Sequence, residues 1–204
     1  MPNHRPQPLR RAALDADPIC QFERWFAEAE RELPLPEAMT LATVDADCRP
    51  DARMVLLKGF GADGFRFFSN YESAKGRQLA ERPLAALVIY WRELDRQVRL
   101  AGPVSRLSAE DSDAYFATRP RESQVAASAS PQSEPIEGRD RLEQRVRAIE
   151  QANPGELPRP AHWGGYLLKP ESIELWQGGP GRLHDRFLYA REDSGGWRLE
   201  RLAP

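Results

Sequence analysis

The first apolar residues of the chain recur at helical spacing. Phe22, Trp25 and Phe26 repeat with a period near 3.6, and Asp17-Pro18 before them supplies a capping carboxylate and a proline for the first turn. The pattern predicts an amphipathic helix that begins after Asp17 and ends before Pro34.

After this helix the pattern changes to short runs of alternating or continuous apolar residues, which are typical of β-strands. Turn sequences such as Ala62-Asp63-Gly64 separate neighbouring runs and favour antiparallel hairpins. Nine segments have strand-like patterns, one of them interrupted at Gly102-Pro103, and from them we predict seven or eight strands; the segments are residues 39–44, 52–60, 65–68, 84–91, 97–107, 165–168, 172–176, 183–190 and 197–202.

Further helices are predicted between groups of strands, at residues 73–82, from Ser108 onward and at residues 139–152, whereas residues 126–138 are rich in Ser, Ala and Pro and predict a loop. The order of elements favours a mainly β protein with peripheral helices (α+β), built as an antiparallel barrel, over a doubly wound sheet. We expect one domain over residues 17–204, after a flexible N-terminal tail at residues 1–16.

Composition narrows the classes of function. The formal net charge is −2 and the pI is near 6.0, which argues against nucleic acid as the main partner. The two cysteines lack CxxC spacing and the three histidines are scattered, so no metal site is expected. No apolar run reaches membrane-spanning length and no signal peptide is evident. We therefore expect a soluble, cytoplasmic protein that does not bind membranes.

The segment Trp176-Gln177-Gly178-Gly179, followed by Arg182-Leu183-His184-Asp185-Arg186, contains the most informative cluster of polar residues. If it runs as a strand, Arg182, His184 and Arg186 point to one face. Two guanidinium groups beside an imidazole suit the capture of a phosphate or carboxylate. A solvated face of an edge strand explains this segment equally well when it is taken alone.

Three other segments combine cations with groups that bind anions. The segment from Arg53 to Lys58 has a cation at each end, but a regular strand sends residues five apart to opposite faces, so a bulge or a second subunit would be needed to bring them together. The segment from Ser69 to Lys75 joins a strand to a helix and could cradle phosphate, although simple capping by Ser73 also explains it. The segment from Tyr115 to Ser123 has two arginines at a helix end, where cations also stabilise the helix dipole.

The chain lacks the glycine-rich signatures GxGxxG and GxxxxGK[ST], and no serine has the context GxSxG. A phosphate-bearing cofactor would therefore be held by scattered cations.

Taken together and in order, these segments resemble the pyridoxine/pyridoxamine 5′-phosphate oxidase family. The resemblance covers nearly the whole chain, from about Asp17 to Pro204. Its most specific pieces are Arg53 to Lys58, Arg119-Pro120-Arg121 with Ser123, Gln132-Ser133, Trp163-Gly164-Gly165 and the segment from Trp176 to Arg186.

The resemblance implies an FMN-binding split β-barrel that works as a homodimer, with two flavins at the subunit interface. Carried over position by position, the FMN-binding residues are Arg53, Met54, Val55, Leu56, Leu57, Lys58, Phe68, Ser69, Lys75, Gln97, Gln132, Ser133, Trp176 and Arg186. The substrate-binding residues are Lys58, Tyr115, Arg119, Ser123, Arg182 and His184, of which Arg182 and His184 are the expected catalytic pair.

The implied reaction converts pyridoxamine 5′-phosphate or pyridoxine 5′-phosphate to pyridoxal 5′-phosphate. A hydride passes from C4′ of the substrate to flavin N5, and O₂ reoxidises the flavin with release of H₂O₂. The flavin carries the redox chemistry, while the protein supplies binding, orientation and electrostatics.

The chain departs from the family pattern at three places. Ala74 stands where many members have arginine, Ser128 stands where tryptophan is usual, and the segment before Asp17 lacks the Arg-x-Glu-Tyr stretch that many members fold over the active site. These departures concern FMN affinity, closure of the site and substrate preference.

Two other functions remain open. One is a flavin oxidase of the same fold acting on another substrate, such as the phenazine-biosynthesis members, which tend to lose the residues that bind the substrate phosphate. The other is a carrier or sensor that holds FMN or pyridoxal phosphate without turnover.

Overall fold

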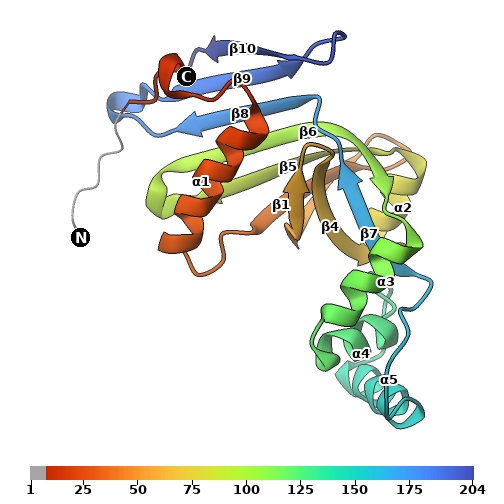
Figure 1. The fold of residues 1–204 in the computed structure, drawn as a ribbon. Helices are drawn as coiled ribbons and strands as arrows, with labels where there is room; N and C mark the ends of the chain where they lie inside the picture. Colours follow the sequence, from red (N-terminus) through yellow and green to blue (C-terminus); the bar gives the residue numbers. More distant parts are fainter. Residues whose placement is uncertain (1–7) are drawn as a thin grey trace.

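A computed structural model describes residues 8–204 of the chain, which form a strongly curled antiparallel sheet with helices at its periphery (Figure 1). The helices are η1 (Arg11–Ala13), α1 (Pro18–Glu32), α2 (Ala74–Glu81), η2 (Arg92–Leu94), α3 (Ala109–Thr118), α4 (Arg121–Ala129), α5 (Arg139–Ala152) and η3 (Pro180–Arg182). The strands are β1 (Ala38–Val44), β2 (Pro50–Leu56), β3 (Gly59–Gly61), β4 (Gly64–Asn70), β5 (Leu84–Trp91), β6 (Arg96–Arg106), β7 (Trp163–Leu168), β8 (Ser172–Gln177), β9 (Asp185–Arg191) and β10 (Trp197–Leu202). No helix among these residues is long and apolar enough to cross a membrane.

The strands follow the order β10-β9-β8-β6-β5-β1-β2, and β7, β4 and β3 curl away from β6 to form the second wall. Every strand pair is antiparallel. The predicted fold class, mainly β with peripheral helices in a split barrel, is therefore confirmed.

Strand β6 joins the two walls. Its pairing with β8 ends at Ala101, and its pairing with β7 begins at Val104. Between them, Gly102 lies so close to the Lys169 carbonyl oxygen that a Cβ atom would approach it to 2.2 Å. The expected interruption at Gly102-Pro103 is thus a change of partner inside one continuous strand, made possible by the absence of a side chain.

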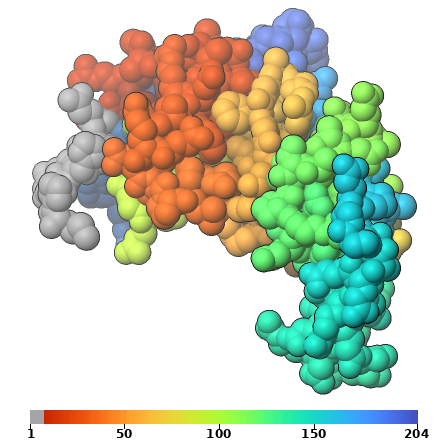
Figure 2. Space-filling model, turned by 60° about the horizontal axis from the view of Figure 1, so that its bottom comes forward, coloured from red at the N-terminus to blue at the C-terminus, as the bar shows by residue number. Residues whose placement is uncertain are grey.

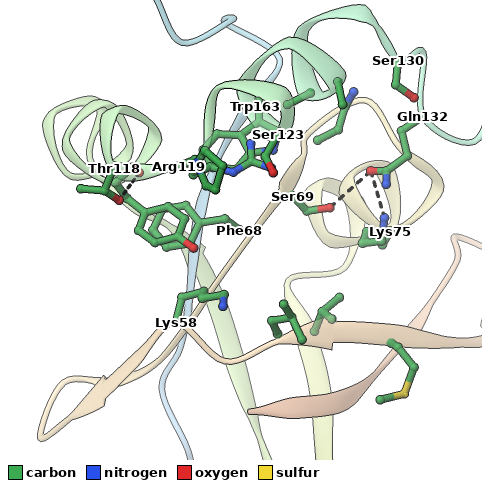
Figure 3. A pocket seen from close by; sticks show the side chains of 18 residues that line it. Lys58, Phe68, Ser69, Lys75, Thr118, Arg119, Ser123, Ser130, Gln132 and Trp163 are labelled. Carbon is green, nitrogen blue, oxygen red and sulfur yellow. Dashed lines mark hydrogen bonds between the residues drawn. The ribbon is translucent and has the colours of Figure 1, made fainter. Parts of the chain in front are cut away.

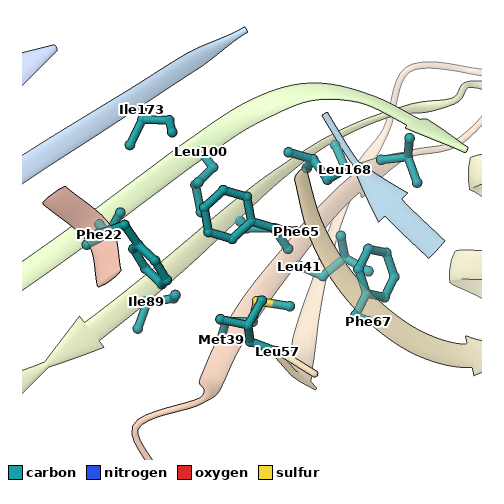
Figure 4. Close-up of a cluster of buried hydrophobic side chains, with 14 of the residues drawn as sticks. Phe22, Met39, Leu41, Leu57, Phe65, Phe67, Ile89, Leu100, Leu168 and Ile173 are labelled. Carbon is teal, nitrogen blue, oxygen red and sulfur yellow. The ribbon is translucent and has the colours of Figure 1, made fainter. Parts of the chain in front are cut away.

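The core lies between the two walls and under α1 (Figure 4). Phe22 of α1 is fully buried and makes edge-to-face contacts with Phe60 and Phe65, at centroid distances of 4.8 and 5.0 Å. In β1, intermediate and buried positions alternate, so one face of the strand enters the core and the other points outward. This alternation leaves an outer sheet face that the helices do not fill.

Helices α3, α4 and α5 form an arm at one end of the sheet (Figures 1 and 2). Helix α5 has no buried residue, and Figure 2 shows it projecting from the body of the protein. Within the arm, Nη2 of Arg121 in α4 donates to the Asn153 carbonyl at the end of α5, and Nη1 of Arg159 ties the arm to the sheet by donating to the Trp163 carbonyl of β7 at 2.6 Å.

Several predicted elements are confirmed, among them the helix after Asp17, the helix at residues 139–152 and the strand at residues 197–202. Others are corrected. The strand predicted at residues 52–60 is broken at Leu57-Lys58: the Leu57 N–H still donates to the Glu37 carbonyl next to β1, whereas the Lys58 N–H donates to the Arg66 carbonyl of β4. The loop predicted at residues 126–138 begins only after α4, and the described residues form ten strands rather than seven or eight.

The strand predicted at residues 183–190 begins only at Asp185. Arg182 ends the short helix η3 with φ of 63°, and Leu183 follows it, so the predicted alternation of Arg182, His184 and Arg186 on one strand face is wrong. The glycines before the strand, at positions 178, 179 and 181, permit this turn. The alternation of side chains along a strand does not predict it.

Residues 8–16 of the predicted tail contact the sheet. The Leu9 N–H donates to Oδ2 of Asp185 at 2.8 Å, Leu14 packs against the core, and the Asp15 carbonyl accepts from the Tyr189 hydroxyl at 2.7 Å. Residues 1–7 lie outside the described part, and the domain boundary at residue 17 stays a prediction.

Candidate functional site

A cavity of about 660 Å³ lies between strands β2 and β4 and helices α2, α3 and α4 (Figure 3). It brings together most of the predicted site residues from four separate segments. Those that line it are Met54, Val55, Leu56, Lys58, Phe68, Ser69, Lys75, Tyr115, Arg119, Ser123 and Gln132.

The break after β2 decides where Lys58 lies. The Leu57 N–H donates to the Glu37 carbonyl at 2.9 Å, and the Lys58 N–H donates to the Arg66 carbonyl at 2.8 Å. The side chain of Leu57 enters the core, with 4% of its surface exposed, and Lys58 turns to the cavity wall. Leu57, predicted to bind the cofactor, is therefore a core residue in this chain.

One end of the cavity holds Lys58, Tyr115, Arg119 and Ser123. Tyr115 stacks on Phe68 at a centroid distance of 3.8 Å, and the Arg119 guanidinium lies 4.5 Å from the ring centroid of Trp163. Burial lowers the pKa of Arg119 and raises that of Tyr115. Nη1 of Arg119 is buried and makes no hydrogen bond to any described residue. A guanidinium group with a buried, unused donor suits an anionic ligand.

The other end holds Ser69, Lys75 and Gln132. Oε1 of Gln132 accepts from Nζ of Lys75 at 3.2 Å and from Oγ of Ser69 at 3.5 Å, as the dashed lines in Figure 3 show. Burial, and then the positive charge of Arg53, lower the pKa of Lys75. A buried lysine beside another cation favours an anionic partner, because the partner offsets both the desolvation and the repulsion.

Arg53 does not line the cavity, but it lies directly behind this end. Its Nη1 donates to Oγ1 of Thr43 at 2.6 Å and its Nη2 to Oε1 of Gln78 at 3.1 Å, while Asp51 forms an ion pair with it. Ser133, which follows Gln132 with φ of 74°, also lies outside the lining.

The remaining predicted residues form a second cluster on the outer face of the sheet. Gln97 pairs with Trp176, and Trp176 pairs with Arg186, so all three point to the same side. Arg186 is tied to Oε1 of Glu174 at 2.7 Å and to the Ala203 carbonyl at 2.9 Å, and the hydrogen bond to Glu174 raises its pKa. None of these three lines the cavity.

The same outer face reaches the cavity mouth. One row of paired residues crosses six strands, and its members are Met54, Thr40, Val88, Arg99, Glu174 and Leu188. Gln97, Trp176 and Arg186 each lie two residues from a member of this row and share its face. Met54 lines the cavity and is 62% exposed, so cavity and cluster open on one sheet face.

The turn before β9 presents Arg182 and His184. A Cβ atom on Gly179 would lie 2.1 Å from the Leu183 carbonyl oxygen, so the chain can fold back here only because this residue has no side chain. The Gly179 N–H donates to Nδ1 of His184 at 3.2 Å, and the His184 ring lies 4.7 Å from that of Trp176. Arg182 is exposed, and neither residue of the pair lines the cavity of its own chain.

Several lining residues were not predicted from the sequence, namely Asn70, Thr118, Pro120, Ala126, Ala127, Ser130 and Trp163. With Ser123, the three from residues 126–130 repeat at helical spacing along α4. That spacing was readable, but side chains this small do not stand out as a helix face. Trp163 belongs to the motif Trp163-Gly164-Gly165, which supported the family resemblance, but no binding role was predicted for the residue.

Comparison with known proteins identifies the family. The model of the family described as pyridoxamine 5′-phosphate oxidase matches residues 26–153. A second model, described as the pyridoxine 5′-phosphate oxidase C-terminal dimerisation region, matches residues 163–204. The chain belongs to the pyridoxamine 5′-phosphate oxidase family.

Relatives named pyridoxine/pyridoxamine 5′-phosphate oxidase align over nearly the whole chain. The relative from Paraburkholderia phytofirmans is 54% identical over 195 residues, covering 95% of this chain and 92% of that protein. The relative from Acaryochloris marina is 53% identical over 204 residues, covering 99% and 93%.

Solved structures share the fold. PhzG from Burkholderia lata, in complex with tetrahydrophenazine-1-carboxylic acid, superposes with a TM-score of 0.90 at 30% identity, over 96% of this chain and 98% of that one. A pyridoxamine 5′-phosphate oxidase-related, FMN-binding protein from Nostoc punctiforme superposes with a TM-score of 0.74 at 24% identity, over 92% and 98%. The C-terminal dimerisation region contains Trp176, Arg182, His184 and Arg186.

Proposed function

We propose that this protein is an FMN-dependent oxidase that converts pyridoxamine 5′-phosphate and pyridoxine 5′-phosphate to pyridoxal 5′-phosphate, reducing O₂ to H₂O₂. The observation that carries the proposal is a cavity with cationic groups at two separate ends (Figure 3). One end suits the phosphate of FMN and the other suits the phosphate of the substrate. Family membership and the names of close relatives support this assignment.

The donor set fits FMN. Lys75, with Arg53 behind it, supplies positive charge, and Ser69 and Gln132 supply uncharged polar groups at the same end. Met54, Val55 and Leu56 give an apolar wall beside them, as an aromatic ring system needs. When bound, FMN supplies the redox chemistry by accepting a hydride from the substrate.

The other end fits the substrate phosphate. Arg119 offers a guanidinium with a buried, unused donor, Lys58 adds a second positive charge, and Tyr115 and Ser123 add hydroxyl groups. Phosphate prefers charge-assisted hydrogen bonds of this kind, and arginine can form two of them in parallel. The four residues would hold the substrate so that its reactive carbon faces the middle of the cavity.

Arg182 and His184 would complete the site from a second copy of the chain. They lie outside the cavity of their own subunit, on the turn next to an outer sheet face that also carries the cavity mouth. In a dimer packed through this face, a two-fold axis carries the turn of each subunit toward the cavity of the other. The match of residues 163–204 to a dimerisation region supports this arrangement.

The hydrogen bond at His184 defines what its ring offers. Because Nδ1 accepts from the Gly179 N–H, the neutral ring carries its proton on Nε2. His184 would therefore present an N–H donor to the substrate, and Arg182 would present a positive charge beside it. Both groups orient the substrate and exclude water; neither needs to transfer the hydride.

A second candidate function deserves a test, because PhzG superposes with a TM-score of 0.90 and was solved with a tetrahydrophenazine carboxylic acid. A phenazine-type oxidase would oxidise a tricyclic carboxylate that has no phosphate. The intact set of Lys58, Tyr115, Arg119 and Ser123 favours the phosphorylated substrate.

The deciding experiment incubates the purified protein with FMN and pyridoxamine 5′-phosphate in aerobic buffer and follows pyridoxal 5′-phosphate and H₂O₂ together. We expect equal amounts of both products, and a parallel reaction with tetrahydrophenazine-1-carboxylic acid should be much slower. FMN binding without either product would refute the substrate assignment. Anaerobic mixing then separates enzyme from carrier, because only an enzyme bleaches its flavin when substrate is added.

A further inference from the structure

Glu37 places a carboxylate against the cationic end of the cavity. The residue lies in the turn between α1 and β1, and hydrogen bonds hold the backbone at and beside it. The Pro36 carbonyl accepts from Nε1 of Trp91 at 2.9 Å, and the Glu37 carbonyl accepts from the Leu57 N–H at 2.9 Å. Because Lys58 follows Leu57 directly, these contacts fix Glu37 beside the lysine.

The two side chains form an ion pair. Oε1 of Glu37 lies 3.6 Å from Nζ of Lys58, and the side chains keep 26% and 28% of their surface exposed. The field of Glu37 also reaches Tyr115: burial is the largest cause of the raised pKa of this phenol, Arg119 opposes it and Glu37 adds to it. A negative charge therefore faces two of the groups assigned to the substrate phosphate.

Lys58 lies in the wall between two cavities. It lines the cavity described above and also a neighbouring groove of about 520 Å³, between the end of α1 and β3. Glu37 lines only the groove. The ammonium group can therefore serve either the carboxylate on one side or a phosphate on the other, and a phosphate must compete with Glu37 for it.

We propose that Glu37 is a positioning residue that weakens the binding of phosphate at this end and so promotes release of pyridoxal 5′-phosphate. It acts through Lys58, whose ammonium group it holds toward the groove, and through direct repulsion of the phosphate dianion. The inference rests on the proposed function, because it requires a phosphorylated ligand in the cavity.

The test compares Glu37→Gln with wild type and with Glu30→Gln, and all three proteins are loaded with FMN. Glu30 lines the same groove from α1, is exposed and makes no ion pair with Lys58, so it controls for the loss of one negative charge nearby. Dissociation constants are measured for pyridoxal 5′-phosphate, for pyridoxal without phosphate and for FMN, together with inhibition by inorganic phosphate.

We expect Glu37→Gln to tighten pyridoxal 5′-phosphate and inorganic phosphate by about two- to fivefold, the range typical of a partly exposed ion pair. Pyridoxal and FMN should bind as in wild type, and Glu30→Gln should change nothing. A structural role for Glu37 would instead shift all ligands together. Unchanged phosphate affinity, or an equal shift for pyridoxal, would overturn the inference.

The same measurements separate this inference from the proposed function. If wild type binds pyridoxal 5′-phosphate and Glu37→Gln binds it no better, the role of Glu37 is refuted and the function stands. If wild type itself shows no affinity for pyridoxal 5′-phosphate, both are refuted. A second variant, Glu37→Thr, keeps a polar side chain of smaller size and should reproduce the tightening.

Discussion

The cavity and the turn at residues 178–184 carry similar chemistry in different settings. In the cavity, Lys75 is buried and Arg119 has a buried guanidinium nitrogen, so the folded chain has already desolvated these cations. On the turn, Arg182 is exposed and His184 is only half-buried. Desolvated cations bind anions strongly, whereas exposed ones compete with water and salt.

In the proposed function, the cavity and the turn are two halves of one site. A single chain builds the pocket proposed to bind the phosphates, and the turn on the open sheet face is proposed to complete the pocket of a second subunit. In the proposed dimer, cavity and turn act together only across the subunit interface.

Mixed dimers give the strongest test of whether the cavity of one subunit and the turn of the other form one site. Arg119→Ala damages the cavity and Arg182→Ala damages the turn, so each homodimer should lose on the order of a hundredfold in kcat/KM. Co-expression of the two variants with different tags yields a heterodimer in which one site has both lesions and the other has none. We expect that heterodimer to recover about half of the wild-type rate per dimer, as two-fold symmetry requires.

The heterodimer must be compared with a mixture of the two purified homodimers, which should stay inactive. Recovery no greater than in that mixture would show that cavity and turn act within the same chain.

Arg119→Ala alone tests the end of the cavity that is proposed to bind the substrate phosphate. A charge-assisted phosphate contact contributes roughly 1.5–3 kcal/mol, so KM should rise about ten- to a hundredfold while kcat changes less. Steady-state kinetics with pyridoxamine 5′-phosphate measure both constants. The matched control is Arg121→Ala, since Arg121 binds the Asn153 carbonyl instead of lining the cavity. An unchanged KM for Arg119→Ala would rule out its phosphate role.

The turn can be tested with Gly179→Ala. The new methyl group would meet the Leu183 carbonyl oxygen, so the turn must shift and move His184 away from its position. We expect a loss of about tenfold in kcat, because small displacements of an orienting group are costly, while FMN affinity stays unchanged. Gly155→Ala is the control, since nothing lies within 4 Å of its Cβ position. Equal kcat values for the two variants would remove the turn from the site.

Much of the fold could be predicted from the sequence, wherever a local pattern decides the structure. Helix α1 follows from apolar spacing and an N-cap, and its bounds are confirmed at Pro18–Glu32, with Asp17 accepting from the Ile19 N–H at 2.8 Å. Helix α4 was missed, because the face that it turns to the cavity is made of Ser and Ala. The strand before Lys58 was extended too far, because the break depends on the Lys58 N–H changing its partner to Arg66, on another strand.

For the candidate site, the sequence likewise predicted the types of residue but not how they are grouped in space. The residue types that suit phosphate were evident from Arg119, Lys75 and their neighbours, and the family resemblance located the rest. Their grouping was not evident, because Ser69 and Gln132 are 63 positions apart in the sequence and meet only when the chain between them has folded. Likewise, strand parity separates Arg53 from Lys58 but does not predict that Lys58 is the one that lines the cavity.

Local periodicity and side-chain chemistry were enough to predict most of the secondary structure, the antiparallel class and the groups suited to binding phosphate. Only the folded chain shows which cations share a cavity, that Arg182 and His184 lie on a turn outside it, and that Glu37 forms an ion pair with Lys58. The physical reason is that desolvation and charge pairing arise from contacts between distant segments, and these contacts exist only once the sheet has curled around its core.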